Sequence, residues 1–104
     1  MSRPPQRYRQ FIADHPDVGQ AYERLGAAAN EAGPLSPREI ALVKLGIAAG
    51  MLQEGAVHAH ARRAFDAGCT AEDLRHAAVL GITTLGFPRM MAVYSWIEDV
   101  VEKQ

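Results

Sequence analysis

The sequence predicts an all-α protein of about six helices, and three observations carry that prediction. No run of alternating β-branched residues occurs, although a half-buried strand would require one. Capping signals precede two of the apolar segments, as they do at helix starts. Proline and glycine fall at intervals of about one helix length, at Pro16, Gly33-Pro34, Gly50, Gly68 and Gly86-Phe87-Pro88.

Two helices are expected before residue 33. Pro4 and Pro5 can open a short first helix, because proline suits the first helical turn. The residue before a proline avoids helical dihedral angles, so His15-Pro16 ends this helix. A second helix runs roughly from residue 16 to residue 32 and stops at Gly33-Pro34.

The third helix has the clearest start. Ser36 is the expected N-cap, Pro37 occupies the first helical position, and Glu39 completes a capping box. The segment that follows, residues 40–50, is apolar on nearly all sides, which predicts a central helix. Its Gly46 and Gly50 share one face, where another helix can approach closely.

Three further helices complete the expected fold. A break between Gly50 and Gly55 leads into the fourth helix, which ends at Gly68. Thr70 caps the fifth helix over residues 70–85, and Gly86-Phe87-Pro88 forces a turn. The sixth helix starts at Pro88 and carries an apolar stripe of Met90, Tyr94, Ile97 and Val101.

Composition limits the possible functions. The 104 residues predict one domain, 1–104, and a hydrophobic content of 48% predicts a homo-oligomer. A net charge of −1 with interleaved signs argues against nucleic acid. No apolar run is long enough to span a bilayer and the N-terminus has no signal core, so we expect no membrane partner and a cytoplasmic location. A single cysteine, Cys69, excludes any CxxC pair.

The stretch EGAVHAHARRAFDAG, residues 54–68, holds the candidate site residues. Glu54 and His58 project about 40° apart on one helical face, whereas His58 and His60 project about 200° apart. Glu54–His58 is either an orienting carboxylate with a proton carrier or an ordinary surface pair. His60 is either a satisfied core histidine or an acid–base group in an apolar cavity. A metal ion is the weakest alternative, because two ligands from one chain are too few.

Three segments together resemble the carboxymuconolactone decarboxylase family, which shares its fold with the alkyl hydroperoxidase D proteins. They are LSPREIALVKLGIAAG, HARRAFDAG and CTAEDLRHAAVLGITTLGFPRMMA, and the likeness covers about residues 8–99. It implies a helical bundle around a central helical hairpin, assembled into trimers or hexamers. The redox branch carries a CxxC pair, and here Gln53 and Ala56 stand at those positions, which weakens a peroxidase or peroxiredoxin role.

The resemblance also implies site residues. Glu39 resembles the upstream family glutamate. Counting back from the helix end selects His60 as the family histidine, whereas counting forward from Glu39 selects His58, and we favour His60. We therefore expect a small-molecule enzyme with acid–base chemistry at a subunit interface, using His60, His58, Glu54 and Glu39. A peroxidase-type redox protein and a non-catalytic oligomeric binding module remain as alternatives. We expect no cofactor and no metal, and the substrate is not identified.

Overall fold

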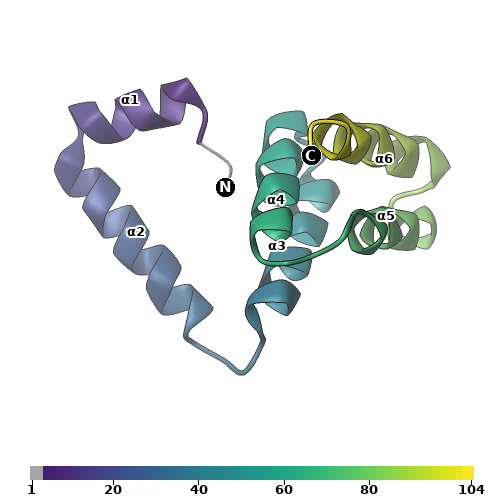
Figure 1. Ribbon diagram of the computed structural model, residues 1–104, viewed down its shortest axis with the longest axis horizontal. Coiled ribbons are helices and arrows are strands. Elements are labelled where there is room, and N and C mark those ends of the chain that lie inside the picture. Colours follow the sequence, from purple (N-terminus) through teal and green to yellow (C-terminus); the bar gives the residue numbers. More distant parts are fainter. Residues whose placement is uncertain (1–3) are drawn as a thin grey trace. The chain divides into compact units, whose positions relative to one another are not determined.

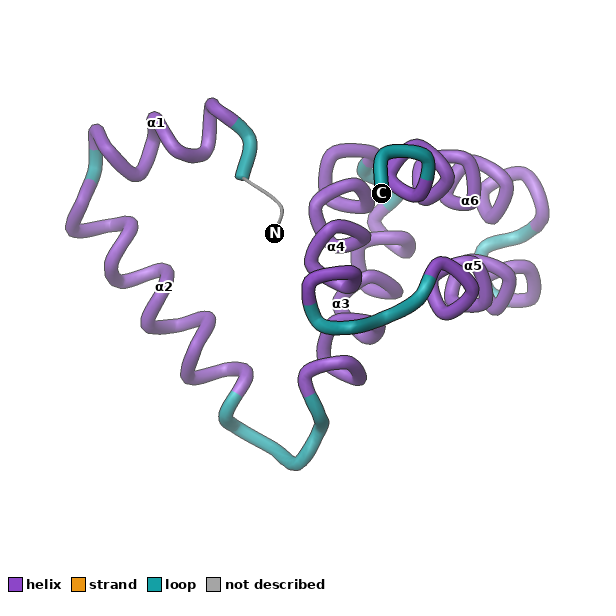
Figure 2. The backbone as a smooth tube through the Cα atoms, in the orientation of Figure 1, coloured by secondary structure: helices purple, strands orange, loops and turns teal. Residues whose placement is uncertain are grey.

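The computed structural model describes residues 4–104, and they form helices joined by short turns (Figure 1). The chain divides into two compact units, one ending at Leu35 and one spanning Ser36–Gln104. Along residues 4–104 there are six α-helices and one 3₁₀ helix, with no strand (Figure 2). The all-α prediction is confirmed, and the expectation of a single domain stays a prediction.

The first unit is a pair of helices with little core of its own. Helix α1 (Gln6–Asp14) and helix α2 (Pro16–Asn30) meet where Gly19 is buried against Ile12. The rings of Tyr8 and Tyr22 make an edge contact with centroids 6.5 Å apart. The larger apolar side chains of this unit stay exposed within the chain: Phe11, Val18, Tyr22 and Leu25.

The second unit opens with the capping box that the sequence predicts. Ser36 Oγ accepts a hydrogen bond from the Glu39 backbone N–H, 3.2 Å away. In return, Glu39 Oε1 accepts from the Ser36 backbone N–H at 2.8 Å. These bonds satisfy two donors at the start of helix α3 (Pro37–Met51), which has Pro37 in its first turn.

Helix α3 and helix α4 (Glu54–Asp66) form a helical hairpin joined by Leu52 and Gln53. Leu52, rather than Gly50 or Gly55, adopts the left-handed conformation that reverses the chain, with φ 53° and ψ 41°. The pair is antiparallel, because Cys69, just after α4, lies 3.8 Å from the carbonyl oxygen of Arg38 at the start of α3. The expected break is present, but a leucine makes the turn.

The fifth helix is shorter than the sequence predicts. Thr70 caps helix α5 (Ala71–Val79) in a second capping box with Asp73. Beyond Val79 the chain tightens into the 3₁₀ helix η1 (Leu80–Thr83) instead of continuing as α-helix to residue 85. Gly81 weakens the α-helix at this point, and the Leu85 side chain folds over it.

Helix α6 (Phe87–Val101) packs against α4 and α5 and closes the core. Gly86 precedes it with φ +94°, a conformation that favours glycine. The buried stripe of α6 is Met90, Val93, Ile97 and Val100, whereas Tyr94 and Val101 of the expected stripe are half-buried. The largest of the almost fully buried side chains of this unit are Leu45, Val57, Leu74, Val93 and Ile97. Among the described residues, no helix combines the length and the apolar character that crossing a membrane requires.

Candidate functional site

Glu54 and His58 lie one turn apart at the start of α4, on the same face. The Leu52 turn sets the point where α4 begins, and Glu54 is its first residue. Glu54 Oε2 is 3.9 Å from His58 Nε2, and the side chains are 59% and 24% exposed, respectively. The sequence interpretation of these two residues as a pair is therefore matched by their geometry.

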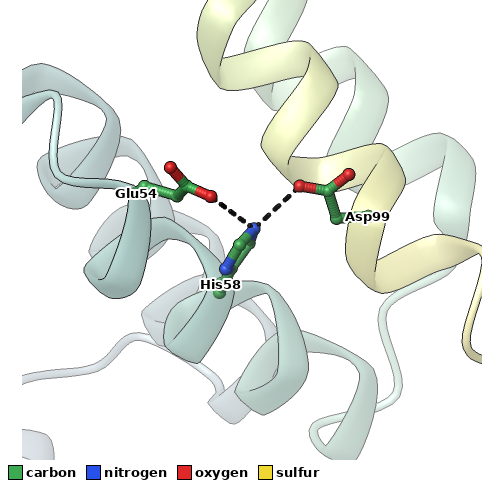
Figure 3. Close-up of side chains that lie close together, drawn as sticks. All are labelled: Glu54, His58 and Asp99. Atoms are coloured by element: carbon green, nitrogen blue, oxygen red, sulfur yellow. Dashed lines mark hydrogen bonds and ion pairs between the residues drawn. The ribbon is translucent and has the colours of Figure 1, made fainter.

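Asp99 of α6 completes a cluster that the sequence interpretation missed. Its Oδ2 lies 3.0 Å from His58 Nε2, within hydrogen-bond distance (Figure 3). In Figure 3 the two carboxylates approach the same ring nitrogen from opposite sides, one from α4 and one from α6. Asp99 lies on α6 between the buried Ile97 and Val100, so the packing of α6 places its backbone, while its side chain is 51% exposed. No local motif signals this contact, because 41 residues separate the two partners.

The cluster borders a small hollow at the end of α6. The hollow measures about 70 Å³ and is lined by His58, Asp99, Arg62, Lys103, Val100 and Gln104. Two cationic side chains thus stand beside the histidine and its carboxylates. The site can exchange a proton at the imidazole and attract a negatively charged group.

His60 has a different environment from His58. It is half-buried on another side of α4, and burial lowers its pKa below the usual 6.5. The positive charges of Arg63 and Lys44 lower that pKa further. Burial and the cationic neighbours thus both favour the neutral form of the His60 ring, whereas the ring of His58 has carboxylate partners.

Glu39 lies at the opposite end of the hairpin from Glu54. Twelve residues separate it from Met51, which corresponds to about 18 Å along α3. Its carboxylate is engaged by Ser36, and these hydrogen bonds lower its pKa. The structure brings Glu54 and His58 together with Asp99, and it uses Glu39 as a helix cap.

A larger cavity of about 430 Å³ lies among α3, α5 and η1. Most of its lining is apolar, and its polar residues include His76, Asp73 and Thr84. Gly46 and Gly50 border it, and a Cβ atom at either would meet no heavy atom within 4 Å in the described residues. The helix contact expected at these glycines is not made by any part of residues 4–104.

Cys69 is a core residue with one polar neighbour. It is 5% exposed, belongs to the same buried cluster as Leu74, and has its Sγ atom near the Arg38 carbonyl oxygen. It is the only cysteine of the sequence. This burial is typical of a free cysteine that packs as a small apolar side chain.

Comparison with known families gives one match. The sequence profile of the carboxymuconolactone decarboxylase family matches residues 16–99. The matched segment starts at the first residue of α2 and ends at Asp99, so it contains the whole Glu54–His58–Asp99 cluster. Neither the curated proteins nor the solved structures gave a match.

Proposed function

Because the chain belongs to the carboxymuconolactone decarboxylase family, we propose that it is a small-molecule enzyme that uses acid–base chemistry at a pocket shared between subunits. The observation that carries the proposal is the 3.0 Å pairing of His58 with Asp99. Sequence reasoning favoured His60 as the proton carrier. We assign the role to His58 instead, because His58 has carboxylate partners and borders a hollow with cationic side chains.

The geometry suggests a role for each group. Asp99 accepts a hydrogen bond from His58 Nε2–H, which holds the ring and selects the tautomer with a free lone pair on Nδ1. That lone pair takes a proton from the substrate, and the carboxylates of Asp99 and Glu54 then stabilise the imidazolium. Arg62 and Lys103 attract a carboxylate of the substrate.

A second subunit is needed to complete this pocket. A hollow of 70 Å³ is far below the roughly 300–1,000 Å³ of ligand sites in general. Several large apolar side chains of α3 and α5 are exposed in the single chain, including Val43, Ile47 and Val79. The open face at Gly46 and Gly50 also leaves room for a helix of another copy. We therefore propose trimers or hexamers, which sedimentation at micromolar concentration would detect against the 11.3 kDa monomer.

One observation favours a second candidate function. The 430 Å³ apolar cavity has the volume and lining of a small-molecule site without a catalytic pair. This favours a non-catalytic oligomeric binding module over a redox protein, because the single cysteine is buried and has no partner cysteine. Binding of an apolar ligand that survives His58→Ala would support this second function.

The test uses carboxymuconolactone as the first probe, with product formation followed by loss of carbon dioxide. His58→Ala should lower kcat by about 10²–10⁴-fold if this ring carries the proton. Asp99→Asn preserves the shape of the side chain and should lower kcat with little change in KM, because the carboxylate acts through the ring. His60→Ala is the matched control on the same helix. Full activity of His58→Ala with loss of activity in His60→Ala would overturn the assignment.

A further inference from the structure

We propose that Glu54, His58 and Asp99 form a binding site for one divalent transition-metal ion such as Zn²⁺. All three side chains offer a ligand atom, and these atoms lie within 4.8 Å of one another. They come from two helices, so the ion would join α4 to α6 (Figure 3). This proposal does not rest on the proposed enzymatic activity.

The observed distances are close to those that an ion requires. Metal–ligand bonds of about 2.1 Å separate neighbouring ligand atoms by about 3.4 Å in a tetrahedron and about 3.0 Å in an octahedron. His58 Nε2 is 3.0 Å from Asp99 Oδ2 and 3.9 Å from Glu54 Oε2. Only the Glu54 carboxylate must move inward, and its exposed side chain leaves it free to do so.

Two of the three ligands are already in contact before an ion binds. The His58 side chain is about three-quarters buried, and the Asp99 carboxylate, whose side chain is 51% exposed, lies 3.0 Å from His58 Nε2. Less ordering is therefore needed when an ion binds. Three protein ligands also leave open coordination positions, as in catalytic rather than structural zinc sites.

The donor types select the class of ion. One imidazole nitrogen with two carboxylate oxygens suits Zn²⁺, Co²⁺ or Mn²⁺, whereas Mg²⁺ and Ca²⁺ prefer oxygen donors alone. Arg62 and Lys103 line the adjoining hollow, and their charges oppose a cation. We therefore expect weaker binding than at a closed structural zinc site, with an anion able to occupy an open position near these two side chains.

Metal and proton compete for the same nitrogen of His58. An ion bound at Nε2 displaces the proton that this nitrogen would otherwise donate to Asp99. Zinc should therefore inhibit any turnover that depends on the His58–Asp99 pair. If zinc binds but no activity is found, the metal site stands and the proposed function fails. If activity depends on His58 but zinc does not bind, the proposed function stands and the metal site fails.

The experiment titrates the full chain, freed of metal with a chelator, with Zn²⁺ by calorimetry and with Co²⁺ by absorption spectroscopy. We expect one ion per chain and a rise in melting temperature with zinc, because the ion binds only the folded state. His58→Ala and Asp99→Asn should each weaken binding at least tenfold, and Glu54→Gln should weaken it less. Circular dichroism of the two isosteric variants, Asp99→Asn and Glu54→Gln, checks that they keep their helical structure.

The matched controls are the remaining histidines. His60→Ala, His76→Ala and His15→Ala should bind zinc with unchanged affinity, because these residues lie outside the cluster. An ion that binds all variants equally would be adventitious and would overturn the proposal. Loss of binding only in one of the three controls would overturn it as well, since the ligand would then be a different histidine.

Discussion

Replacing Leu52 tests whether the hairpin turn stores strain. Among the described residues Leu52 is the one non-glycine with a positive φ, and its side chain packs against the core. Leu52→Ala and Leu52→Gly both remove those contacts, which are worth about 1–1.5 kcal/mol for a half-buried leucine. The two variants differ in the backbone, because only glycine adopts this conformation without a steric penalty.

The expected magnitude follows from that difference. An L-residue in the left-handed region costs about 1–2 kcal/mol, which glycine avoids. Glycine loses more conformational entropy on folding than alanine does, which offsets about 0.5–1 kcal/mol of that gain. Leu52→Gly should therefore be about 0.5–1 kcal/mol more stable than Leu52→Ala. For a chain of this size that difference raises the melting temperature by roughly 2–8 °C. Urea unfolding followed by circular dichroism at a fixed protein concentration measures the same difference.

The control is a pair of variants at an ordinary helix position. Ser95 is exposed near the middle of α6, so Ser95→Ala should be about 1 kcal/mol more stable than Ser95→Gly. The order of alanine and glycine is thus expected to reverse between the two sites. If Leu52→Ala equals or exceeds Leu52→Gly while Ser95 keeps the normal order, Leu52 is not in a strained conformation and the reasoning fails.

Three further outcomes are expected. An NMR titration should give a pKa below 6.5 for His60. Because the unfolded ring binds its proton more readily, the free energy of unfolding should fall as the pH drops from 6.5 through the lowered pKa. His60→Asn should remove this pH-dependent contribution. Gly19→Ala should destabilise the α1–α2 pair in thermal unfolding, because the added Cβ would lie 2.8 Å from Ile12 Cγ2. Gly26→Ala is the control: its Cβ would meet no heavy atom of the described residues within 4 Å, so it should stabilise α2 by up to about 1 kcal/mol. Cys69→Ser should leave any peroxide turnover unchanged, and a large loss would restore a redox role for this thiol.

Local sequence chemistry was sufficient for most of the fold. Residues three apart predict the capping box at Ser36, and the sequence also predicts a cap at Thr70; both caps are present, and the one at Thr70 is a capping box as well. The errors concern places where tertiary packing decides the backbone. Leu52 makes the hairpin turn although two glycines stood nearby, and η1 replaces the last turns of the fifth helix where Leu85 folds over Gly81.

The candidate site could be predicted only as far as one helix reaches. Helical angles placed Glu54 beside His58 and turned His60 away, since both relations depend on positions within α4. Asp99 comes from α6, and its approach depends on how α6 packs on α4. The geometry of a single helix does not say how two helices pack, so Asp99, the third member of the cluster, could be identified only from the structure.

The two histidines of α4 are suited to different tasks, and this follows from the charges around them. His60 is near Arg63 and Lys44, which favour its neutral form together with burial, so a proton on that ring is held weakly. His58 stands between two carboxylates, which lie 3.0 Å and 3.9 Å from its Nε2 atom. An acid–base cycle needs a group that both accepts and retains a proton until it is returned. Of these two histidines, His58 is the one with carboxylate partners, which is why we propose it as the proton carrier in place of the histidine that the helix-end count selects.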